Sequence, residues 1–130
     1  MVNASHFFLL ADGCENPLSE QKLSQLSSGK TFIALDGACR LLYGLDIVPD
    51  IILGDMDSAD SDILDHFEKK GSKIVTAPDQ NFSDFEKGIM YCHEHNAQSI
   101  DVFNACHGRM DHFIGNVFFL KKYYNPHCPI

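Results

Sequence analysis

The chain has 130 residues, a length that suits a single domain. Its hydrophobic fraction of 45% and charged fraction of 22% are those of a globular protein, and its formal charge of −8 argues against general nucleic-acid binding, which needs clustered lysine and arginine. The five cysteines are odd in number and widely spaced, so they predict reduced thiols in a cytoplasmic protein. The apolar stretch near the N-terminus is too short for a signal peptide or a membrane span.

Short apolar runs alternate with helical patterns along the chain. In chain order, the sequence predicts a strand at 6–10, a helix at 18–27, a strand at 31–35, a helix at 37–44, a strand at 50–53, a helix at 60–70, a strand at 72–76, a helix at 84–96, a strand at 99–103 and a last helix at about 109–123. Ser83 is expected to cap the helix at 84–96 in a capping box with Glu86, and Phe85, Ile89 and Cys92 form a core-facing stripe. The alternation predicts an α/β fold with a mostly parallel sheet.

In a parallel α/β sheet, the loops that follow the strands lie at one edge, where ligands bind. Acidic or amide side chains follow every predicted strand, at Asp12, at Asp36, at Asp55 with Asp57, from Asp79 to Asp84, and from Asn104 to Asp111. We therefore expect loops that are distant in sequence to meet at this edge. It is the candidate active site.

Two aspartates one residue apart follow the strand at 50–53. In an extended segment residues i and i+2 point to the same side, so the carboxylates of Asp55 and Asp57 can face one cavity. Such carboxylates repel each other unless a cation lies between them, and Mg²⁺ is typically held by one or two carboxylates with water and phosphate oxygens. Alternatively, Asp55 caps a turn, and Asp57 or Ser58 caps the helix that starts near residue 60. The motif alone leaves both interpretations open.

Two further loops combine acidic and basic residues at a helix start. Backbone amides and Lys87 could bind phosphate while Asp84 binds a metal ion, or the segment could be an N-capped amphipathic helix with a solvated lysine. In the later loop, Arg109 could contact an oxyanion and Asp111 could orient or deprotonate a hydroxyl. The alternative there is that Asp111 offsets the helix dipole and pairs with Arg109.

Other candidate motifs are weaker. The run Cys92–His95 (CHEH) looks like a set of zinc ligands, but on one helix these side chains fan apart, and the H-E-x-x-H motif is absent. The sequence contains no Walker P-loop, no dinucleotide-binding glycine motif and no nucleophile elbow. Taken together, the acidic loops favour a site for Mg²⁺ and a polyphosphate.

The ordered motifs resemble those of thiamine pyrophosphokinases. These motifs are Asp36–Ala38 (DGA), Pro49–Ser58 (PDIILGDMDS), Asp79–Lys87 (DQNFSDFEK) and Gly108–His112 (GRMDH) with Asn116. The resemblance implies a Rossmann-like three-layer α/β domain with a mostly parallel sheet of five or six strands and flanking helices. It also implies transfer of diphosphate from ATP to the hydroxyl of thiamine, giving thiamine diphosphate and AMP, with Mg²⁺ as cofactor.

The resemblance further implies roles for individual residues. The residues expected at the catalytic centre are Asp55, Asp57, Asp84 and Asp111, and the first three of these are expected to hold Mg²⁺. The residues expected to contact ATP or thiamine are Asp36, Ser58, Gln80, Ser83, Lys87 and Arg109. Among them, Gln80 is expected beside the thiamine pyrimidine, and Asp36 on the nucleotide side.

The resemblance also implies a domain organisation. Residues 1–124 are expected to form the catalytic, ATP-binding domain and residues 125–130 the start of a linker, with the C-terminal β domain of the family absent from this chain. The full-length enzyme is expected to be a cytoplasmic homodimer that binds neither nucleic acid nor membranes. Two alternatives stay open: a diphosphokinase of the same fold that acts on another alcohol, such as a hydroxymethyl pterin, or a non-catalytic nucleotide-binding remnant.

Overall fold

The structure, a computed structural model, describes residues 3–11, 19–56, 60–79, 81–103 and 120–130. Strands and helices alternate along these residues, as the sequence predicts. In chain order the elements are β1 (Asn3–Leu10), α1 (Glu20–Ser27), β2 (Lys30–Leu35), the 3₁₀ turn η1 (Asp36–Ala38), α2 (Cys39–Leu45), β3 (Ile51–Gly54), α3 (Ser61–Lys69), β4 (Lys73–Thr76), α4 (Asp84–Glu94) and β5 (Ser99–Phe103). Among the described residues, no helix is both long and apolar enough to cross a membrane.

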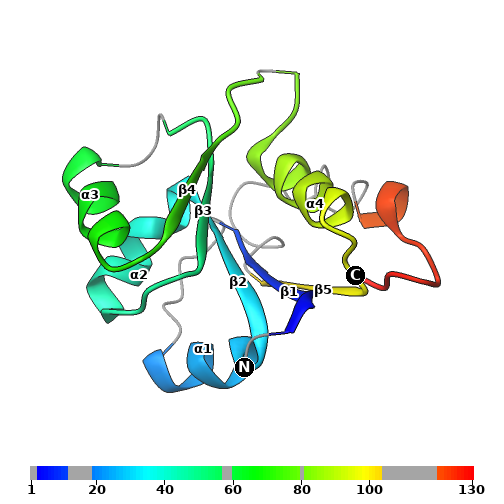
Figure 1. The fold of residues 1–130 in the computed structure, drawn as a ribbon, viewed down its shortest axis with the longest axis horizontal. Helices are drawn as coiled ribbons and strands as arrows, with labels where there is room; N and C mark the ends of the chain where they lie inside the picture. Colours follow the sequence, from blue (N-terminus) through cyan, green and yellow to red (C-terminus); the bar gives the residue numbers. More distant parts are fainter. Residues whose placement is uncertain (1–2, 12–18, 57–59, 80, 104–119) are drawn as a thin grey trace.

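The five strands form one sheet in the order β4-β3-β2-β1-β5, and every neighbouring pair is parallel. The predicted parallel α/β fold is therefore confirmed. The chain moves outward from β1 to β4 on one side and returns with β5 to the other side of β1 (Figure 1). Because all strands run in the same direction, their carboxyl ends share one edge of the sheet.

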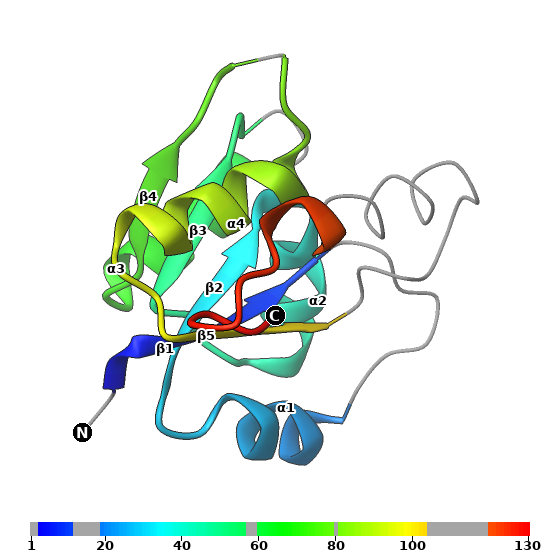
Figure 2. The same ribbon diagram turned by 90° about the vertical axis from the view of Figure 1, so that its right-hand side faces the viewer.

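Helices cover both faces of the sheet, which gives three layers (Figures 1 and 2). Alternate residues of each strand face opposite sides, so each strand contributes to two apolar cores. Core residues facing α1, α2 and α3 include Phe8 and Phe32, whose rings meet edge to face at 5.1 Å. The strand residues facing α4 include Leu9 and Ile33. The sheet is thus buried on both sides, as its apolar strands predict.

Helix α4 covers the second face and carries the predicted stripe: Phe85, Ile89 and Cys92 are buried in the core beneath it. Gly88 lies where α4 comes closest to the sheet, because a Cβ at this position would lie 3.0 Å from a methyl group of Leu9. The helix therefore packs closely against the middle of the sheet.

The C-terminal residues lie against α4 and β5 (Figure 2). Of the helix expected at 109–123, the described residues 120–123 are helical, and residues 104–119 lie outside the described residues. Cys128 is buried in the core under α4, and the Ile100 amide donates to the Pro129 carbonyl at 3.0 Å. Residues 128–130 thus pack on the domain, while the domain boundaries stay a prediction.

Candidate active site

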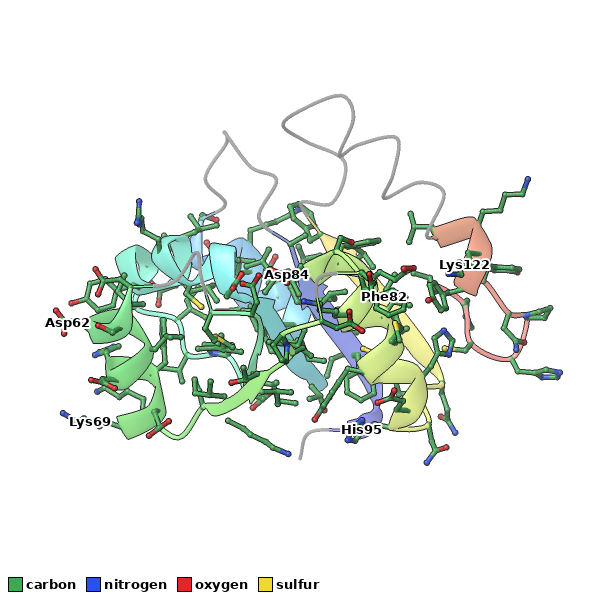
Figure 3. All side chains as sticks on the ribbon, turned by 90° about the horizontal axis from the view of Figure 1, so that it is seen from above. Asp62, Lys69, Phe82, Asp84, His95 and Lys122 are labelled. Atoms are coloured by element: carbon green, nitrogen blue, oxygen red, sulfur yellow. The ribbon has the colours of Figure 1, made fainter. Side chains whose placement is uncertain are left out.

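Three aspartates meet at the edge formed by the carboxyl ends of the strands. Asp36 follows β2, Asp55 follows β3, and Asp84 is the first residue of α4. One carboxylate oxygen of each lies within 4.8 Å of the others. Figure 3 shows Asp84 at the start of α4 near the centre of the molecule, far from Asp62 on α3 and from His95 beyond the other end of α4. The structure thus brings together residues from three loops that are distant in sequence.

Asp36 is the buried member of this cluster, with a residue exposure of 2%. Its Oδ2 accepts a hydrogen bond from the Met56 amide at 2.8 Å. Burial, a hydrogen bond with Asp84 and the charge of Asp84 raise the pKa of Asp36 from 3.8 to about 7, against the lowering effect of the Met56 amide. Proximity thus makes it unfavourable for all three groups to be charged together unless a cation is present.

The turn that carries Asp55 is built closely around the Asp36 carboxylate. Met56 has φ of +70°, an uncommon conformation for a residue with a side chain. A Cβ at Gly54 would lie 2.6 Å from Cγ of Asp36, so only glycine fits at this point of closest approach. The alternative that Asp57 or Ser58 caps the following helix is wrong. The N-cap of α3 is Asp60, whose side chain accepts a hydrogen bond from the Asp62 amide at 2.8 Å.

The start of α4 fixes Asp84 and Lys87. Ser83 caps the helix as predicted, with Oγ accepting from the Glu86 amide at 3.2 Å. Lys87 is not solvated, because its side chain is 7% exposed and its ammonium lies 3.6 Å from Asp84. The same ammonium donates to the Ala77 carbonyl at 2.5 Å, which ties α4 to the loop after β4.

Glu86 differs from the expectation that it completes a capping box with Ser83. Its carboxylate, in a side chain that is 5% exposed, accepts from Lys122 at 3.3 Å and from the Tyr123 hydroxyl at 3.2 Å. It therefore ties α4 to the C-terminal helical residues, a contact between residues too distant in sequence for a local motif to predict.

A cavity of about 240 Å³ lies between α4 and the edge strand β4. Phe82, Met90 and Tyr91 contribute much of its apolar lining, and Asp79 and Glu94 add carboxylates. Lys87 also lines it, so the cavity begins beside the acidic cluster. The site therefore combines an acidic centre with an adjoining space that is mostly apolar.

The cluster can hold a metal ion of a particular kind. Oxygen-only ligands suit hard cations such as Mg²⁺, Ca²⁺ and Mn²⁺ rather than zinc. Within the described ranges, Asp36, Asp55 and Asp84 are the one group of potential ligands with this geometry. Burial raises the pKa of Cys92 to about 12, which disfavours the thiolate that a zinc site at Cys92–His95 would need.

The remaining predicted site residues lie outside the described residues: Asp57, Ser58, Gln80, Arg109 and Asp111. The family resemblance implies a nucleotide-side contact for Asp36 and does not include it among the metal ligands. The order of the strands in the sheet explains why Asp36 belongs to the cluster. Because β2 and β3 are neighbours, the residues that follow them, Asp36 and Asp55, come together at the sheet edge.

Comparison with known proteins relates the chain to one family. Residues 21–130 match the family described as "Thiamin pyrophosphokinase, catalytic domain". The chain belongs to this family. It is 37% identical over 82 residues to thiamine pyrophosphokinase 1 of Arabidopsis thaliana, a match that covers 58% of this chain and 31% of that protein. It is 27% identical over 143 aligned positions to thiamin pyrophosphokinase 1 of Caenorhabditis elegans, covering 95% of this chain and 57% of that protein.

Solved thiamin pyrophosphokinase structures share the fold. The structure from Candida albicans matches with a TM-score of 0.77 and 21% identity, over 96% of this chain and 56% of that one. The structure from Bacillus subtilis matches with a TM-score of 0.71 and 24% identity, over 90% and 55% respectively. The chain thus spans between about a third and somewhat more than half of the thiamine pyrophosphokinases it matches.

Proposed function

We propose that this chain is the catalytic, ATP-binding domain of a thiamine diphosphokinase, which transfers diphosphate from ATP to the hydroxyl of thiamine and releases AMP. The observation that carries the proposal is the convergence of Asp36, Asp55 and Asp84 in a chain of this family. A negatively charged polyphosphate can bind beside acidic side chains only if cations lie between them. A carboxylate cluster supplies the ligands for such cations.

The donor set fits Mg²⁺. Asp55 and Asp84 would hold the ion, with Asp57 from the sequence prediction, and Asp36 is the buried third member of the cluster. When bound, the ion would neutralise phosphate charge and help to fix the donor for in-line transfer. The protein itself mainly needs to orient the reactants, since diphosphate transfer does not require a covalent nucleophile.

Lys87 forms an ion pair with Asp84 and so lies beside the carboxylate cluster. The Lys87 ammonium lies 3.6 Å from an oxygen of Asp84 and helps to hold that carboxylate in place. The same positive charge would lie close to the phosphates of a bound ATP. Ser58, Ser83 and Arg109 are proposed as further groups beside the phosphates, and Asp111 as the acceptor of the thiamine proton.

The cavity between α4 and β4 is proposed to admit the acceptor. Thiamine has two flat aromatic rings, of which the thiazolium is a cation, and the aromatic side chains of Phe82 and Tyr91 with the carboxylates of Asp79 and Glu94 offer suitable chemistry. Gln80, expected beside the thiamine pyrimidine, directly follows Asp79. The names of the relatives support thiamine over a pterin alcohol as the acceptor.

The proposal extends to the whole protein. Residues 1–124 would be the catalytic domain, and a homodimer in the cytoplasm is expected for the full-length enzyme. Cys92 and Cys128 are buried free thiols, which accords with a reducing compartment.

Product analysis tests the proposed reaction. The protein is incubated with ATP, Mg²⁺ and thiamine, and AMP and thiamine diphosphate are quantified. Asp84→Asn should lower the rate by about 100-fold, because it removes a carboxylate that would hold the ion that neutralises phosphate charge. Asp62→Asn is the matched control, since Asp62 also lies in the first turn of a helix but is exposed and far from Asp84, and it should leave the rate unchanged.

Two results would contradict the proposal. Formation of AMP with a hydroxymethyl pterin but not with thiamine would assign another acceptor. Absence of turnover, together with ATP binding that is equally strong in the wild type and in Asp84→Asn, would indicate a nucleotide-binding remnant.

A further inference from the structure

Asp36 contacts the backbone on both sides of Asp55. On one side its Oδ2 accepts from the Met56 amide at 2.8 Å. On the other side the chain passes so close at Gly54 that a Cβ there would lie 2.7 Å from the same oxygen. The carboxylate of Asp36 therefore lies inside the turn that carries Asp55.

This turn adopts a conformation that its sequence does not favour. Met56 has φ of +70°, in the left-handed region, where residues with a side chain are strained. Such a conformation persists when surrounding contacts determine it. The described contacts at Met56 are the hydrogen bond to Asp36 and the packing of its side chain against the core that faces α1, α2 and α3.

Asp36 itself is well fixed. It begins the η1 turn directly after the buried strand β2, and its exposure is 2%. A carboxylate buried in this way is costly unless it is hydrogen-bonded, so the Met56 amide also stabilises Asp36. A rigid element thus supplies the acceptor, and the more irregular turn after β3 conforms to it.

We propose that Asp36 is a positioning residue, whose carboxylate holds the Gly54–Met56 turn so that Asp55 faces Asp84. This role goes beyond the nucleotide-side contact that the family resemblance implies for Asp36. The inference rests on the proposed function for its relevance to cation binding, but its structural part does not depend on a bound ion.

Two substitutions separate this role from a purely electrostatic one. Asp36→Asn and Asp36→Ala remove the same ionisable group, and Asp36→Asn alone keeps an oxygen that can accept from the Met56 amide. If Asp36 positions the turn, the asparagine variant keeps the turn and the alanine variant loses it. If charge alone matters, the two variants behave alike.

The first measurement is hydrogen exchange of the Met56 amide by NMR without divalent ions. We expect protection in the wild type and in Asp36→Asn, and exchange at least about tenfold faster in Asp36→Ala, since loss of a buried acceptor leaves the amide without its partner. Equal protection of Met56 in all three proteins, or equal loss in both variants, would overturn the proposal. The amides of the β2 strand serve as an internal control that each variant is folded.

The second measurement is Mn²⁺ affinity of the same three proteins by calorimetry. Asp36→Asn should bind Mn²⁺ about tenfold more tightly than Asp36→Ala, because positioning is worth roughly one buried hydrogen bond. Equal affinities of the two variants, with the wild type binding Mn²⁺, would overturn the link to cation binding. If the wild type binds no Mn²⁺, the metal chemistry of the proposed function fails, and the exchange result decides the positioning role alone.

Discussion

Asp36 keeps a proton over a pH range in which an exposed aspartate has lost it, because burial and the neighbouring Asp84 raise its pKa from 3.8 to about 7. Between these two pH values the folded protein binds more protons than the unfolded chain. The free energy of unfolding therefore falls as the pH rises toward 7. Without divalent ions, we expect urea unfolding to give a free energy that falls by an extra amount on the order of 2 kcal/mol between pH 5 and pH 8, relative to Asp36→Asn. Equal pH dependence of both proteins would contradict the raised pKa.

Gly54 leaves room for the Asp36 carboxyl group, and no other residue can do so without displacing it. A Cβ would lie 2.6 Å from Cγ of Asp36, well inside contact distance. Gly54→Ala should therefore lower the free energy of unfolding by about 1–3 kcal/mol, as overpacking does, and should weaken Mn²⁺ binding by displacing the turn. Calorimetry and urea unfolding measure both effects. An alanine variant with wild-type stability and Mn²⁺ affinity would show that the turn is not built around Asp36.

The single residues also show what sequence could and could not predict at the site. Asp55 and Asp84 could be nominated because acidic residues after strands of a parallel sheet share an edge. The central place of Asp36 could not, because it depends on β2 and β3 being neighbours and on the left-handed turn at Met56. The sequence also allowed a solvated Lys87, and its burial involves a tertiary contact with the Ala77 carbonyl in the loop after β4.

Helix α4 connects the core to the site, and its close packing explains why it carries a glycine in its interior. A Cβ at Gly88 would lie 3.0 Å and 3.2 Å from the two terminal methyl carbons of Leu9 and 3.3 Å from Leu35. Leu9 is fully buried and cannot easily move aside. The same glycine would be a poor choice in an exposed helix, where alanine is favoured.

Gly44 in α2 provides the matched comparison, because nothing lies within 4 Å of a Cβ built there. Gly44→Ala should stabilise the protein by about 0.5–1 kcal/mol through helix propensity. Gly88→Ala should instead destabilise it by about 1 kcal/mol, since the cost of overpacking exceeds the same gain. Thermal or urea unfolding compares them. Equal stabilisation by both substitutions would mean that α4 packs less closely on the sheet than described.

The elements themselves were predictable to within a few residues because their patterns are strong. The run of apolar residues in β1 to β3 and the stripe on α4 reflect burial on both faces of a sheet, which is a local property of the sequence. The contact of Glu86 with Lys122 and Tyr123 was not predictable, because it joins segments 36 and 37 residues apart. A capping-box pattern also fits Glu86, and the tertiary partners decide between the two arrangements.

In the molecule as a whole, packed layers support the sheet edge at which the three aspartates meet. Two apolar cores fix the sheet between α4 and the helices α1, α2 and α3 (Figure 2). The buried strand β2 therefore holds Asp36 rigidly, Asp55 follows the neighbouring strand β3, and α4 brings Asp84 to both of them. The proposed function is compatible with a net charge of −8, because the carboxylates that would hold a cation are gathered at one place of the sheet edge.

The most direct test of this account is the position of a divalent ion. Crystals of the protein grown with ATP and Mn²⁺, measured near the manganese absorption edge, should show an anomalous peak within about 2–2.5 Å of carboxylate oxygens of Asp55 and Asp84. A peak at another place, or no peak in crystals that contain bound ATP, would contradict the claim that these aspartates form the cation site.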